Sequence, residues 1–411
     1  MNPIPIFHNK HILLGVTGSI AAYKAVDLAS RLTQAGAVVT TILTDSATRF
    51  VTPLTFRSVT GQRALTDLWS DEAHIIHVDL AEHAHLFIIA PASAHTIAKL
   101  ANGLADNLLT VTALAARCPI VLAPAMDGGI YSNPVTQANL KTLVERGFTL
   151  VGPASGRMAS GLVGKGRLVE PLEIFGHARL RLARSGPLTG RHIVVTAGGT
   201  QEPLDPVRFI TNRSSGKQGF ALAQAALDHG AQVTLITGPT VSTALATPVG
   251  ARRIDVNTAA EMAEAVLRAC AEADALVMAA AVADFRPSYV AEQKIKKATT
   301  PKIDLEKTVD ILGAVAERRE TTRRPDVLVG FAAESQNLVE NAREKIQRKK
   351  LTLIVANDIS APDAGFSGDT NRVTLIDADE GVEQLPLLPK TQVAEAVMDR
   401  VTRLLKAGHG H

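Results

Sequence analysis

The 411-residue chain contains 46 % apolar and 20 % charged residues, and its formal net charge is +3. This composition is typical of globular proteins, and a length above roughly 300 residues favours two domains over one. A small charge spread along the whole chain does not indicate nucleic-acid binding, and no apolar stretch approaches the ~20 residues that span a bilayer. The N-terminal residues lack the pattern of a signal peptide, so we expect a cytoplasmic protein.

The first half of the sequence alternates short apolar runs with segments of helical periodicity. Residues 12–16 form an apolar run, which is followed by a turn and by apolar residues at helical spacing as far as Gly36. Further buried strands are predicted at residues 38–43, 86–90 and 120–123, with helical stretches between them. This alternation predicts a doubly wound, mainly parallel sheet with helices on both faces.

A glycine-containing turn at residues 15–19 connects the first predicted strand to its helix. Backbone N–H groups and the positive end of a helix dipole favour a phosphate at such a turn. Its glycine spacing matches neither the dinucleotide fingerprint nor the P-loop, so a tight connection without a ligand is the competing interpretation. Small hydroxyl residues also follow two other predicted strands, at residues 44–46 and 91–96. Open α/β sheets bind ligands at these strand ends, which favours a ligand site.

Five segments of the first half are similar to motifs of the flavin-dependent cysteine decarboxylase family. They are residues 15–24, 77–80, 90–93, 106–108 and 124–126. The resemblance covers nearly the whole half and implies a flavodoxin-like domain that binds FMN. It assigns the role of catalytic base to His77, and an imidazole suits this role because its pKa lies near neutral pH. It also implies flavin contacts from Gly15, Thr17, Gly18, Ser19, Thr44, Ser93, Ala94 and Thr96.

Two positions in this half differ from the family pattern. Asp127 stands where the family has an asparagine that binds the substrate carboxylate, and an ionised aspartate would repel that carboxylate. Ser160 stands where the family has a lid cysteine that donates a proton, and a hydroxyl is a far weaker acid than a thiol. Three interpretations stay open: decarboxylation of 4'-phosphopantothenoylcysteine by an altered proton path, release of an oxidised enethiol, or a flavin-binding domain without turnover.

A break in the periodicity at residues 181–190 separates the two halves, and we predict domains of 1–187 and 188–411. A new apolar strand begins directly after the break, at residues 193–196. Later strands are predicted at residues 233–236, 275–279, 327–331 and 351–356. The second half is therefore expected to be another doubly wound, Rossmann-like domain.

A polar segment that opens the next predicted helix is the strongest candidate for anion binding. Asn212, two serines, a glycine and Lys217 lie close together there, and helix N-terminal amides attract phosphate and carboxylate groups. A polar helix cap would account for Ser214 and Ser215, but not for the neighbouring Arg213 and Lys217. We therefore predict a phosphate or carboxylate pocket at this segment.

A lysine run follows the predicted strand 275–279. Asp284 stands just after the strand, and the run contains Lys294, Lys296 and Lys297. Such a run is most often a solvated surface. Its position after a strand end that carries an acid favours a triphosphate site, with Asp284 available to a sugar, a base edge or Mg²⁺.

Together, these residues resemble the phosphopantothenate–cysteine ligase family over roughly the whole second half. With both halves in this order, the chain is similar to the bifunctional flavoproteins of coenzyme A biosynthesis. The resemblance implies that the 4'-phosphopantothenate carboxylate attacks the α-phosphorus of CTP, and that the L-cysteine amine then displaces CMP from the acyl-cytidylate. Asn212 would steady this intermediate, and Lys294 would neutralise charge in the second step, with Mg²⁺ between the phosphates.

The resemblance also implies which residues hold the two substrates. CTP contacts are expected from Met278, Ala279, Ala280, Asp284, Lys294, Thr308, Val309, Asp310, Ile311, Phe331, Lys345 and Lys349. Thr308 and Val309 depart from the residues that the family usually has there. Contacts to 4'-phosphopantothenate are expected from Arg208, Ser214, Ser215, Gly216 and Lys217. A homo-oligomer is expected, with trimers of the flavin domain and dimers of the ligase domain.

Two other classes of function compete with the enzyme interpretation. The altered Asp127 and Ser160 are compatible with a regulatory protein that binds flavin and nucleotide without turnover, although the intact second-half segments argue against it there. An NAD-dependent oxidoreductase fits the α/β order. The sequence lacks the glycine spacing of the dinucleotide fingerprint and the acidic residue that follows it, which disfavours that class.

Overall fold

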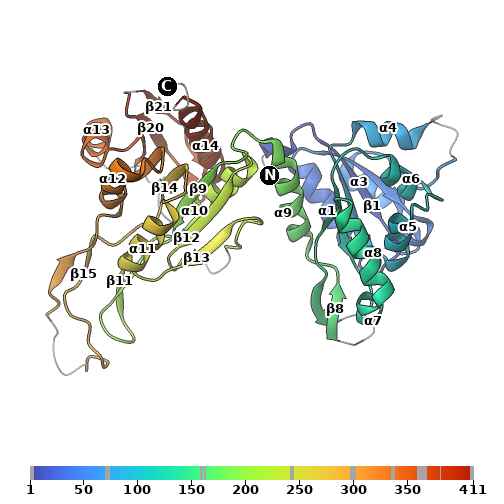
Figure 1. Cartoon of the computed structure of the whole chain (residues 1–411), viewed down its shortest axis with the longest axis horizontal. Coiled ribbons are helices and arrows are strands. Elements are labelled where there is room, and N and C mark those ends of the chain that lie inside the picture. Colours follow the sequence, from blue (N-terminus) through green and yellow to red (C-terminus); the bar gives the residue numbers. More distant parts are fainter. Residues whose placement is uncertain are drawn as a thin grey trace. The chain divides into compact units, whose positions relative to one another are not determined.

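The computed structural model describes residues 4–69, 75–157, 161, 163–240, 245–296, 302–334, 338–358, 368–379 and 381–407. The chain divides into two compact units, Met1–Arg184 and Ser185–His411, called the N-terminal and C-terminal units below. Both consist of a sheet flanked by helices (Figure 1), so the predicted α/β class is confirmed. Among the described residues, no helix is long and apolar enough to cross a membrane.

The N-terminal unit contains a six-stranded sheet in the order β3-β2-β1-β4-β5-β6, and all of its strand pairs are parallel. Its strands are β1 (His11–Val16), β2 (Val38–Leu43), β3 (Ala64–Leu65), β4 (Leu86–Ala92), β5 (Ile120–Pro124) and β6 (Thr149–Leu150). The order reverses at β1, which pairs with both β2 and β4. A doubly wound sheet binds its ligands outside the carboxyl ends of the strands at such a reversal.

The helices of this unit cover both faces of the sheet. They are α1 (Ala22–Gln34), α2 (Asp45–Thr48), α3 (Pro53–Thr60), α4 (Ile76–His83), α5 (Ala94–Asn102), α6 (Leu108–Ala115), α7 (Gly128–Ser132), α8 (Pro134–Glu145) and α9 (Pro171–Leu182), with the short 3₁₀ helices η1 (Pro5–Phe7) and η2 (Ala183–Ser185). A hairpin of β7 (Ala154–Arg157) and β8 (Val163–Arg167) stands apart from the sheet. Successive β1 residues face opposite cores: Leu14 packs with Leu28 of α1, whereas Leu13 packs with Ile97 of α5.

The C-terminal unit contains an eight-stranded sheet in the order β13-β12-β9-β14-β17-β18-β20-β21. Its strands are β9 (His192–Ala197), β12 (Gln232–Thr237), β13 (Arg252–Asp255), β14 (Ala275–Met278), β17 (Val327–Glu334), β18 (Leu353–Asp358), β20 (Val373–Asp377) and β21 (Val382–Gln384). Pairing is parallel from β13 to β18 and antiparallel from β18 to β21. The sheet is mainly parallel, as predicted, and its order reverses at β9.

The helices of the C-terminal unit are α10 (Lys217–Asp228), α11 (Ala259–Ala269), α12 (Ile311–Thr322), α13 (Leu338–Lys349) and α14 (Lys390–Ala407). Three small antiparallel pairs lie outside the main sheet: β10 (Gln201–Pro203) with β11 (Phe209–Thr211), β15 (Phe285–Pro287) with β16 (Leu305–Lys307), and β19 (Thr370–Asn371) with β22 (Leu388–Pro389). The first two pairs form an arm that extends from the sheet, with β15 toward its end (Figure 1).

Candidate functional site

In the N-terminal unit, the turn after β1 is fixed by the buried side chain of Thr17. The Thr17 hydroxyl donates to the carbonyl of Pro91 (2.8 Å) and accepts the N–H of Ser93 (2.9 Å). Thr17 is only 1 % exposed. The predicted flavin contact Thr17 therefore uses its hydroxyl to hold the turn after β1 against the loop after β4, at the reversal of strand order.

Glycine is required where the turn after β1 meets the loop after β2. A Cβ atom added to Gly18 would lie 2.5 Å from the Cβ of Ser46, which is closer than side-chain atoms pack. A Cβ atom on Gly15 would likewise lie 2.9 Å from a methyl group of Leu109. Ser19, the next hydroxyl, accepts the N–H of Ala21 (3.2 Å) where the chain enters α1.

The other predicted flavin contacts begin two short helices. Thr44 caps α2 by accepting the N–H of Ala47 (3.3 Å), and Ser93 caps α5 by accepting the N–H of Thr96 (3.3 Å). Ala94 is the first residue of α5. Because β1, β2 and β4 are adjacent and parallel, these hydroxyls and the 15–19 turn lie at one edge of the sheet. The structure thus brings the predicted flavin contacts together.

The predicted catalytic residues of this unit lie on other segments. His77 is the second residue of α4, is half-buried, and stands on a helix that packs against α6. Asp127 caps α7, where its Oδ1 accepts the N–H of Gly129 (2.9 Å). Capping accounts for a short polar side chain at position 127, but not for its charge, because asparagine caps equally well. Ser160 lies outside the described residues.

A cavity of about 550 Å³ lies beside the helix that Asp127 caps. Its walls come from α7, α8 and the β7–β8 hairpin, and Lys165 of β8 reaches over the ring of Tyr131 at 5.5 Å. The backbone N–H of Met126 donates to the carbonyl of Gly166 (2.9 Å), which ties the hairpin to the loop before Asp127. The hairpin that frames position 160 therefore forms part of a cavity wall.

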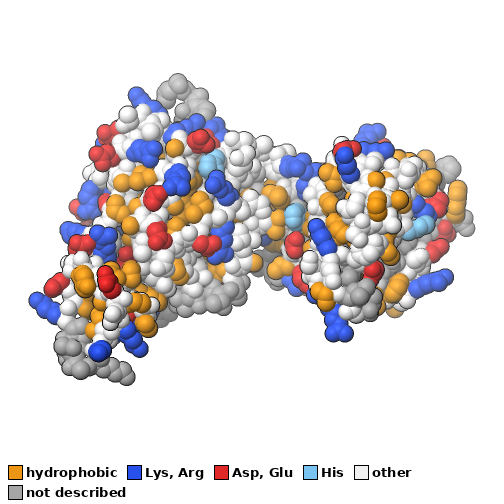
Figure 2. Space-filling view, turned by 60° about the horizontal axis from the view of Figure 1, so that its bottom comes forward, with side chains coloured by type: hydrophobic (Ala, Val, Ile, Leu, Met, Phe, Trp, Pro, Cys, Tyr) orange, Lys and Arg blue, Asp and Glu red, His pale blue; other side chains and the backbone are white. Residues whose placement is uncertain are grey.

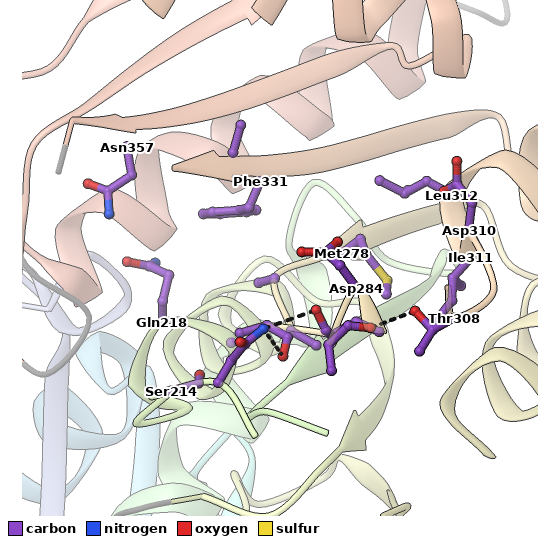
Figure 3. Close-up of a pocket in the computed structure, with 18 of the residues that line it drawn as sticks. Ser214, Gln218, Met278, Asp284, Thr308, Asp310, Ile311, Leu312, Phe331 and Asn357 are labelled. Carbon is purple, nitrogen blue, oxygen red and sulfur yellow. Dashed lines mark hydrogen bonds between the residues drawn. The ribbon is translucent and has the colours of Figure 1, made fainter. Parts of the chain in front are cut away.

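In the C-terminal unit, a larger cavity of about 700 Å³ opens at the carboxyl ends of the parallel strands. Figure 3 shows Phe331 and Asn357 on one side of it, Ser214 and Gln218 on another, and Thr308 near Asp310 and Leu312. Most of the predicted site residues line this cavity: Asn212, Ser214, Ser215, Gly216, Met278, Ala279, Ala280, Asp284, Thr308, Val309, Asp310, Ile311, Phe331, Lys345 and Lys349. Arg208, Lys217 and Lys294 do not belong to its wall.

The loop after β14 forms part of the cavity wall and is held by buried threonines. The N–H of Ala280 donates to the hydroxyl of Thr196 (3.1 Å), and the N–H of Ala283 donates to the hydroxyl of Thr200 (3.0 Å). Both threonines are fully buried. The hydroxyl of Thr308 in turn donates to the carbonyl of Ala283 (2.6 Å). These contacts fix the backbone that would face a nucleotide.

Asn212 is anchored to the same loop. Its Nδ2 donates to the carbonyls of Val282 (3.1 Å) and Ala281 (3.4 Å). This orientation directs the amide of Asn212 toward the loop that carries the predicted CTP contacts. Gly216, which precedes α10, has a φ of 73°. This left-handed conformation favours glycine, and an added Cβ would also lie 2.6 Å from Thr240.

The cationic side of the cavity is formed by α13. Lys345, Arg348 and Lys349 line the cavity, and Lys349 donates to Asp310 (3.0 Å), the capping residue of α12. Burial would raise the pKa of Asp310, but hydrogen bonds from Gly313 and Lys349 lower it below its usual value. Asp310 therefore stays ionised and holds Lys349 at the cavity wall.

Sequence reasoning missed several cations of this cavity, among them Lys390. It is the first residue of α14, is 6 % exposed and lines the cavity. Burial lowers the pKa of Lys390, and the nearby charge of Lys217 lowers it further, while Asp369 opposes the shift. Lys217, at the start of α10, pairs with Asp369 (2.6 Å). No local sequence pattern indicated this role, because Lys390 is brought to the cavity by the antiparallel strands β20 and β21, which precede α14.

Two asparagines near Lys390 have side-chain oxygens that find no hydrogen-bond partner among the described residues. Asn357 and Asn371 line the cavity and are 8 % and 5 % exposed. In the described part of the chain, neither side-chain oxygen accepts a hydrogen bond. Asn371 donates through Nδ2 to Gln218 (3.1 Å), which itself donates to the carbonyl of Lys390 (3.2 Å). These hydrogen bonds connect the end of β19 with the starts of α10 and α14.

Comparison with known proteins identifies two family models that together cover most of the chain. The model described as Flavoprotein matches residues 7–178. The model described as DNA/pantothenate metabolism flavoprotein C-terminal domain matches residues 188–405. The two matches follow one another in the order expected from the sequence motifs.

Two relatives are similar over almost their full length, and both are named coenzyme A biosynthesis bifunctional protein. The one from Bacillus subtilis is 45 % identical over 407 residues, which is 98 % of each chain. The one from Vibrio cholerae is 46 % identical over 395 residues, which is 95 % of this chain and 97 % of the relative. A solved structure of the C-terminal domain of such a protein is 39 % identical, with a TM-score of 0.46, and covers 54 % of this chain and 100 % of that one.

Proposed function

The chain belongs to the family of bifunctional coenzyme A biosynthesis proteins, and from this premise we propose how its two units divide the reactions. The C-terminal domain, residues 188–411, joins L-cysteine to 4'-phosphopantothenate at the expense of CTP. The N-terminal domain, residues 1–187, binds FMN and decarboxylates the resulting 4'-phosphopantothenoylcysteine to 4'-phosphopantetheine. The first proposal is supported by the larger cavity and the second by the set of strand-end residues around the 15–19 turn.

The single observation that carries the ligase proposal is the chemistry of the 700 Å³ cavity. Four cationic side chains, Lys345, Arg348, Lys349 and Lys390, line it from α13 and α14. An anhydride can form between a carboxylate and a triphosphate only if the charge of both anions is neutralised. A cavity of this size also falls within the range that holds nucleotide-sized ligands, roughly 300 to 1,000 Å³.

Within this cavity, we assign the nucleotide to the wall that carries Phe331 and the loop 279–284. Phe331 offers an aromatic face to the base, and the backbone of the loop offers fixed amide and carbonyl groups. Asp284 is exposed toward the cavity and is the carboxylate available to the ribose or to Mg²⁺. Magnesium is commonly held by one or two carboxylates together with the substrate phosphates, and this residue set fits that pattern.

The carboxylate of 4'-phosphopantothenate is assigned to the end of the cavity near Asn212. Ser214, Ser215 and Gly216 line that end at the start of α10, where backbone N–H groups point at an anion. Asn212 would hold the acyl-cytidylate against the loop after β14. Lys217, at the first position of α10, lies outside the cavity wall and pairs with Asp369.

In the N-terminal domain, the residues present fit the phosphate and ring of FMN. The turn 15–19 places backbone N–H groups before α1, and Gly18 leaves no side chain between this turn and Ser46. Ser93 and Thr96 lie at the start of α5, directly after the adjacent strand β4. FMN, when bound, supplies the acceptor for oxidation of the cysteine moiety. We propose that His77 takes up the proton released in this step.

The serine at position 160 favours a second product of the N-terminal domain. Return of the hydride to the substrate requires an acid that protonates the enethiol, and a serine hydroxyl protonates it far less readily than a thiol. Release of the oxidised enethiol is therefore the alternative outcome for this unit. Asp127 adds a negative charge where the substrate carboxylate would bind, which weakens binding of the acid.

The ligase proposal is tested by the release of pyrophosphate. The purified protein is mixed with CTP, 4'-phosphopantothenate and L-cysteine, and pyrophosphate and the acyl product are measured with ATP in place of CTP as the control. We expect pyrophosphate in the complete mixture and much less with ATP. No pyrophosphate in any mixture would refute the ligase proposal.

The decarboxylase proposal is tested by the product mass and by one substitution. Synthetic 4'-phosphopantothenoylcysteine is incubated with the yellow protein, and the product is identified by mass spectrometry as the decarboxylated thiol, the enethiol or the unchanged acid. Ser160→Cys restores the acid that the family has. If serine limits the proton return, this variant will shift the product from enethiol to decarboxylated thiol.

We also propose that the chain assembles into a homo-oligomer, with dimers formed through the C-terminal domain. The arm carries exposed apolar side chains, among them Val207, Phe209, Phe285, Tyr289 and Leu305. Figure 2 shows apolar side chains among the charged ones at the end of the unit that carries this arm. Light scattering of the whole protein tests the proposal, and a monomer at micromolar concentration would refute it. Trimers of the N-terminal domain remain part of the same proposal.

A further inference from the structure

The arm of the C-terminal unit contains a buried carboxylate, Asp205, in the turn between β10 and β11. Asp205 is 3 % exposed, although its near neighbours Val207 and Phe209 are largely exposed. A buried charge is tolerated only where hydrogen bonds and opposite charge compensate for the lost solvation. The contacts of this side chain therefore show what it holds in place.

The two oxygens of Asp205 hold different parts of the chain. Oδ1 accepts the backbone N–H groups of Val207 and Arg208, both at 2.8 Å, which closes the turn between β10 and β11. Oδ2 accepts Nε and Nη2 of Arg208, at 2.9 Å and 2.5 Å, and the backbone N–H of Ile295 at 3.1 Å. The hydrogen bonds from Arg208 hold the pKa of Asp205 far below its usual value, so it stays ionised.

The contact with Ile295 is made through both of its backbone groups. Its N–H is bound by Asp205, and its carbonyl accepts Nη2 of Arg208 at 2.8 Å. Ala291 also donates its N–H to the carbonyl of Leu204 at 3.0 Å. Among the described residues, these are the hydrogen bonds that join the segment 289–296 to the rest of the chain. The segment forms no strand, so these hydrogen bonds hold its backbone in place.

Lys294 directly precedes Ile295. In the proposed function, Lys294 neutralises negative charge in the second step of ligation, when cysteine displaces CMP. Lys294 is exposed and lies outside the cavity wall. A lysine on a long, flexible side chain reaches a reacting group efficiently only if its backbone is held. We propose that Asp205 is a positioning residue for Lys294. Through its Oδ2, Asp205 fixes the backbone of Ile295, the residue next to Lys294. This proposal rests on the ligase function proposed above.

A turn-forming role alone does not account for these contacts. The Oδ1 atom suffices to close the β10–β11 turn, whereas Oδ2 is directed at Arg208 and Ile295. The difference allows the two roles to be separated by one substitution. Asp205→Asn retains one acceptor oxygen for the turn, but its amide cannot accept the N–H of Ile295 or the guanidinium of Arg208.

The test follows the two half-reactions of the ligase separately. Without cysteine, formation of the acyl-cytidylate is measured by mass spectrometry and by pyrophosphate release; cysteine is then added and consumption of the intermediate is timed. We expect Asp205→Asn to leave the KM for CTP unchanged and to slow the second step on the order of 100-fold, as misplacement of a reacting group does. An unchanged second step in this variant would overturn the proposal.

A double-mutant comparison decides whether Asp205 acts through Lys294. If it does, Asp205→Asn will slow the Lys294→Gln variant very little, since the group that it positions is already absent. Equal slowing in the presence and absence of Lys294 would overturn the proposal. Pyrophosphate release by the unaltered protein is measured in parallel. Its absence would refute the ligase function itself, whereas its presence with a normal second step in Asp205→Asn refutes only the role of Asp205.

Asp274→Asn is the matched control for loss of a buried charge. Asp274 is 7 % exposed and accepts the N–H of His192 (2.7 Å) together with Arg191 (2.9 Å) and Arg324 (2.6 Å), at the edge of the sheet opposite the cavity. Both variants lose one buried carboxylate, and their unfolding temperatures are compared. A selective effect of Asp205→Asn on the second step supports the proposal, and an identical effect of Asp274→Asn overturns it.

If the Asp205→Asn variant does not fold, the proposal can still be tested by substituting Ile295, the residue whose N–H Asp205 accepts. Ile295→Pro removes the N–H that Asp205 binds, in a segment without regular structure, while Gln293→Pro changes a neighbouring residue that forms no hydrogen bond among the described residues. We expect Ile295→Pro to slow the second step. In the Gln293→Pro variant, the second step should be much faster than in the Ile295→Pro variant. Equal second-step rates in the two proline variants would contradict the proposal.

Discussion

The two units differ in how threonine side chains hold the loops at the point where the strand order reverses. In the N-terminal unit, Thr17 joins the turn after β1 to the end of β4, and the backbone of a short turn faces the ligand edge. In the C-terminal unit, two threonines, Thr196 and Thr200, hold a longer loop after β14, and this loop becomes a cavity wall. The first arrangement suits an anion bound by backbone amides. The second provides side chains from many elements, as a reaction between two anions requires.

The largest effect that separates the units is expected from Asn212→Ala. This change removes the side chain that is bonded to the carbonyls of Ala281 and Val282 at the proposed ligation site. We predict that ligation falls on the order of 100-fold or more, as it does when a donor at a reacting centre is lost. Flavin content, measured from visible absorbance, will stay unchanged. A parallel loss of flavin would contradict the assignment of the two activities to separate units.

Substitution of Thr17 or Thr200 is expected to have a smaller effect, and each substitution should affect only its own unit. Thr17→Val and Thr200→Val preserve shape but leave the N–H of Ser93 or of Ala283 without its acceptor. An unsatisfied buried N–H costs about 1–3 kcal/mol, which will lower the free energy of unfolding of the altered unit. Thr17→Val will lower flavin content without changing pyrophosphate release, and Thr200→Val will do the reverse.

This pair of variants is checked by measuring both activities and thermal unfolding on each protein. The half-buried Thr48, whose hydroxyl donates to the carbonyl of Asp45 within α2, provides the control, because Thr48→Val removes no buried acceptor. Loss of both activities in either threonine variant would show that the two units do not function independently.

The sequence predicted the features that depend on neighbouring residues along the chain. Residues 38–43 form β2 as expected, and the motif residues that follow β1, β2, β4 and β14 lie at strand ends because parallel strands align these ends. Most predicted nucleotide contacts line the cavity for the same reason. Apolar periodicity and strand order are local or nearly local properties, so they could be recognised without coordinates.

Contacts between distant segments were not accessible from the sequence. Lys390 lines the cavity only because β20 and β21 are antiparallel and return the chain to the start of α14. Nothing near Lys390 in the sequence marks it as different from Lys406, the other lysine of α14. Likewise, the hydroxyl of Thr17 is directed at Pro91 rather than left open, and Asp205 holds Ile295 across the arm. These partners are chosen by tertiary packing.

Lys390 provides a test of the cationic cavity by pH. Burial and then the charge of Lys217 lower the pKa of Lys390, so it loses its proton at a lower pH than an exposed lysine does. A bound polyanion favours the protonated form. We therefore predict that binding of CTP weakens as the pH rises from neutral toward alkaline, before exposed lysines titrate. Isothermal titration of CTP over this range measures the effect.

The variant Lys390→Met should abolish this pH dependence and weaken CTP binding about 10- to 100-fold even at neutral pH, as loss of one charge-assisted contact of ~1.5–3 kcal/mol implies. Lys406→Met, on the exposed end of the same helix, is the control and should retain the parental pH profile. If both variants keep that profile, the pH dependence arises from another group and Lys390 does not contact the nucleotide.

The smallest stability effect, and the sharpest test of the N-terminal unit, is expected from Asp127→Asn. Both residues cap α7 by accepting the N–H of Gly129, so the thermal unfolding temperature should hardly change, whereas Asp127→Ala should lose about 1 kcal/mol. Asparagine removes the charge that opposes the substrate carboxylate, so the KM for 4'-phosphopantothenoylcysteine should fall. If the KM is unchanged, Asp127 serves only as a helix cap, and the carboxylate binds beside Lys165 or elsewhere in the adjoining cavity.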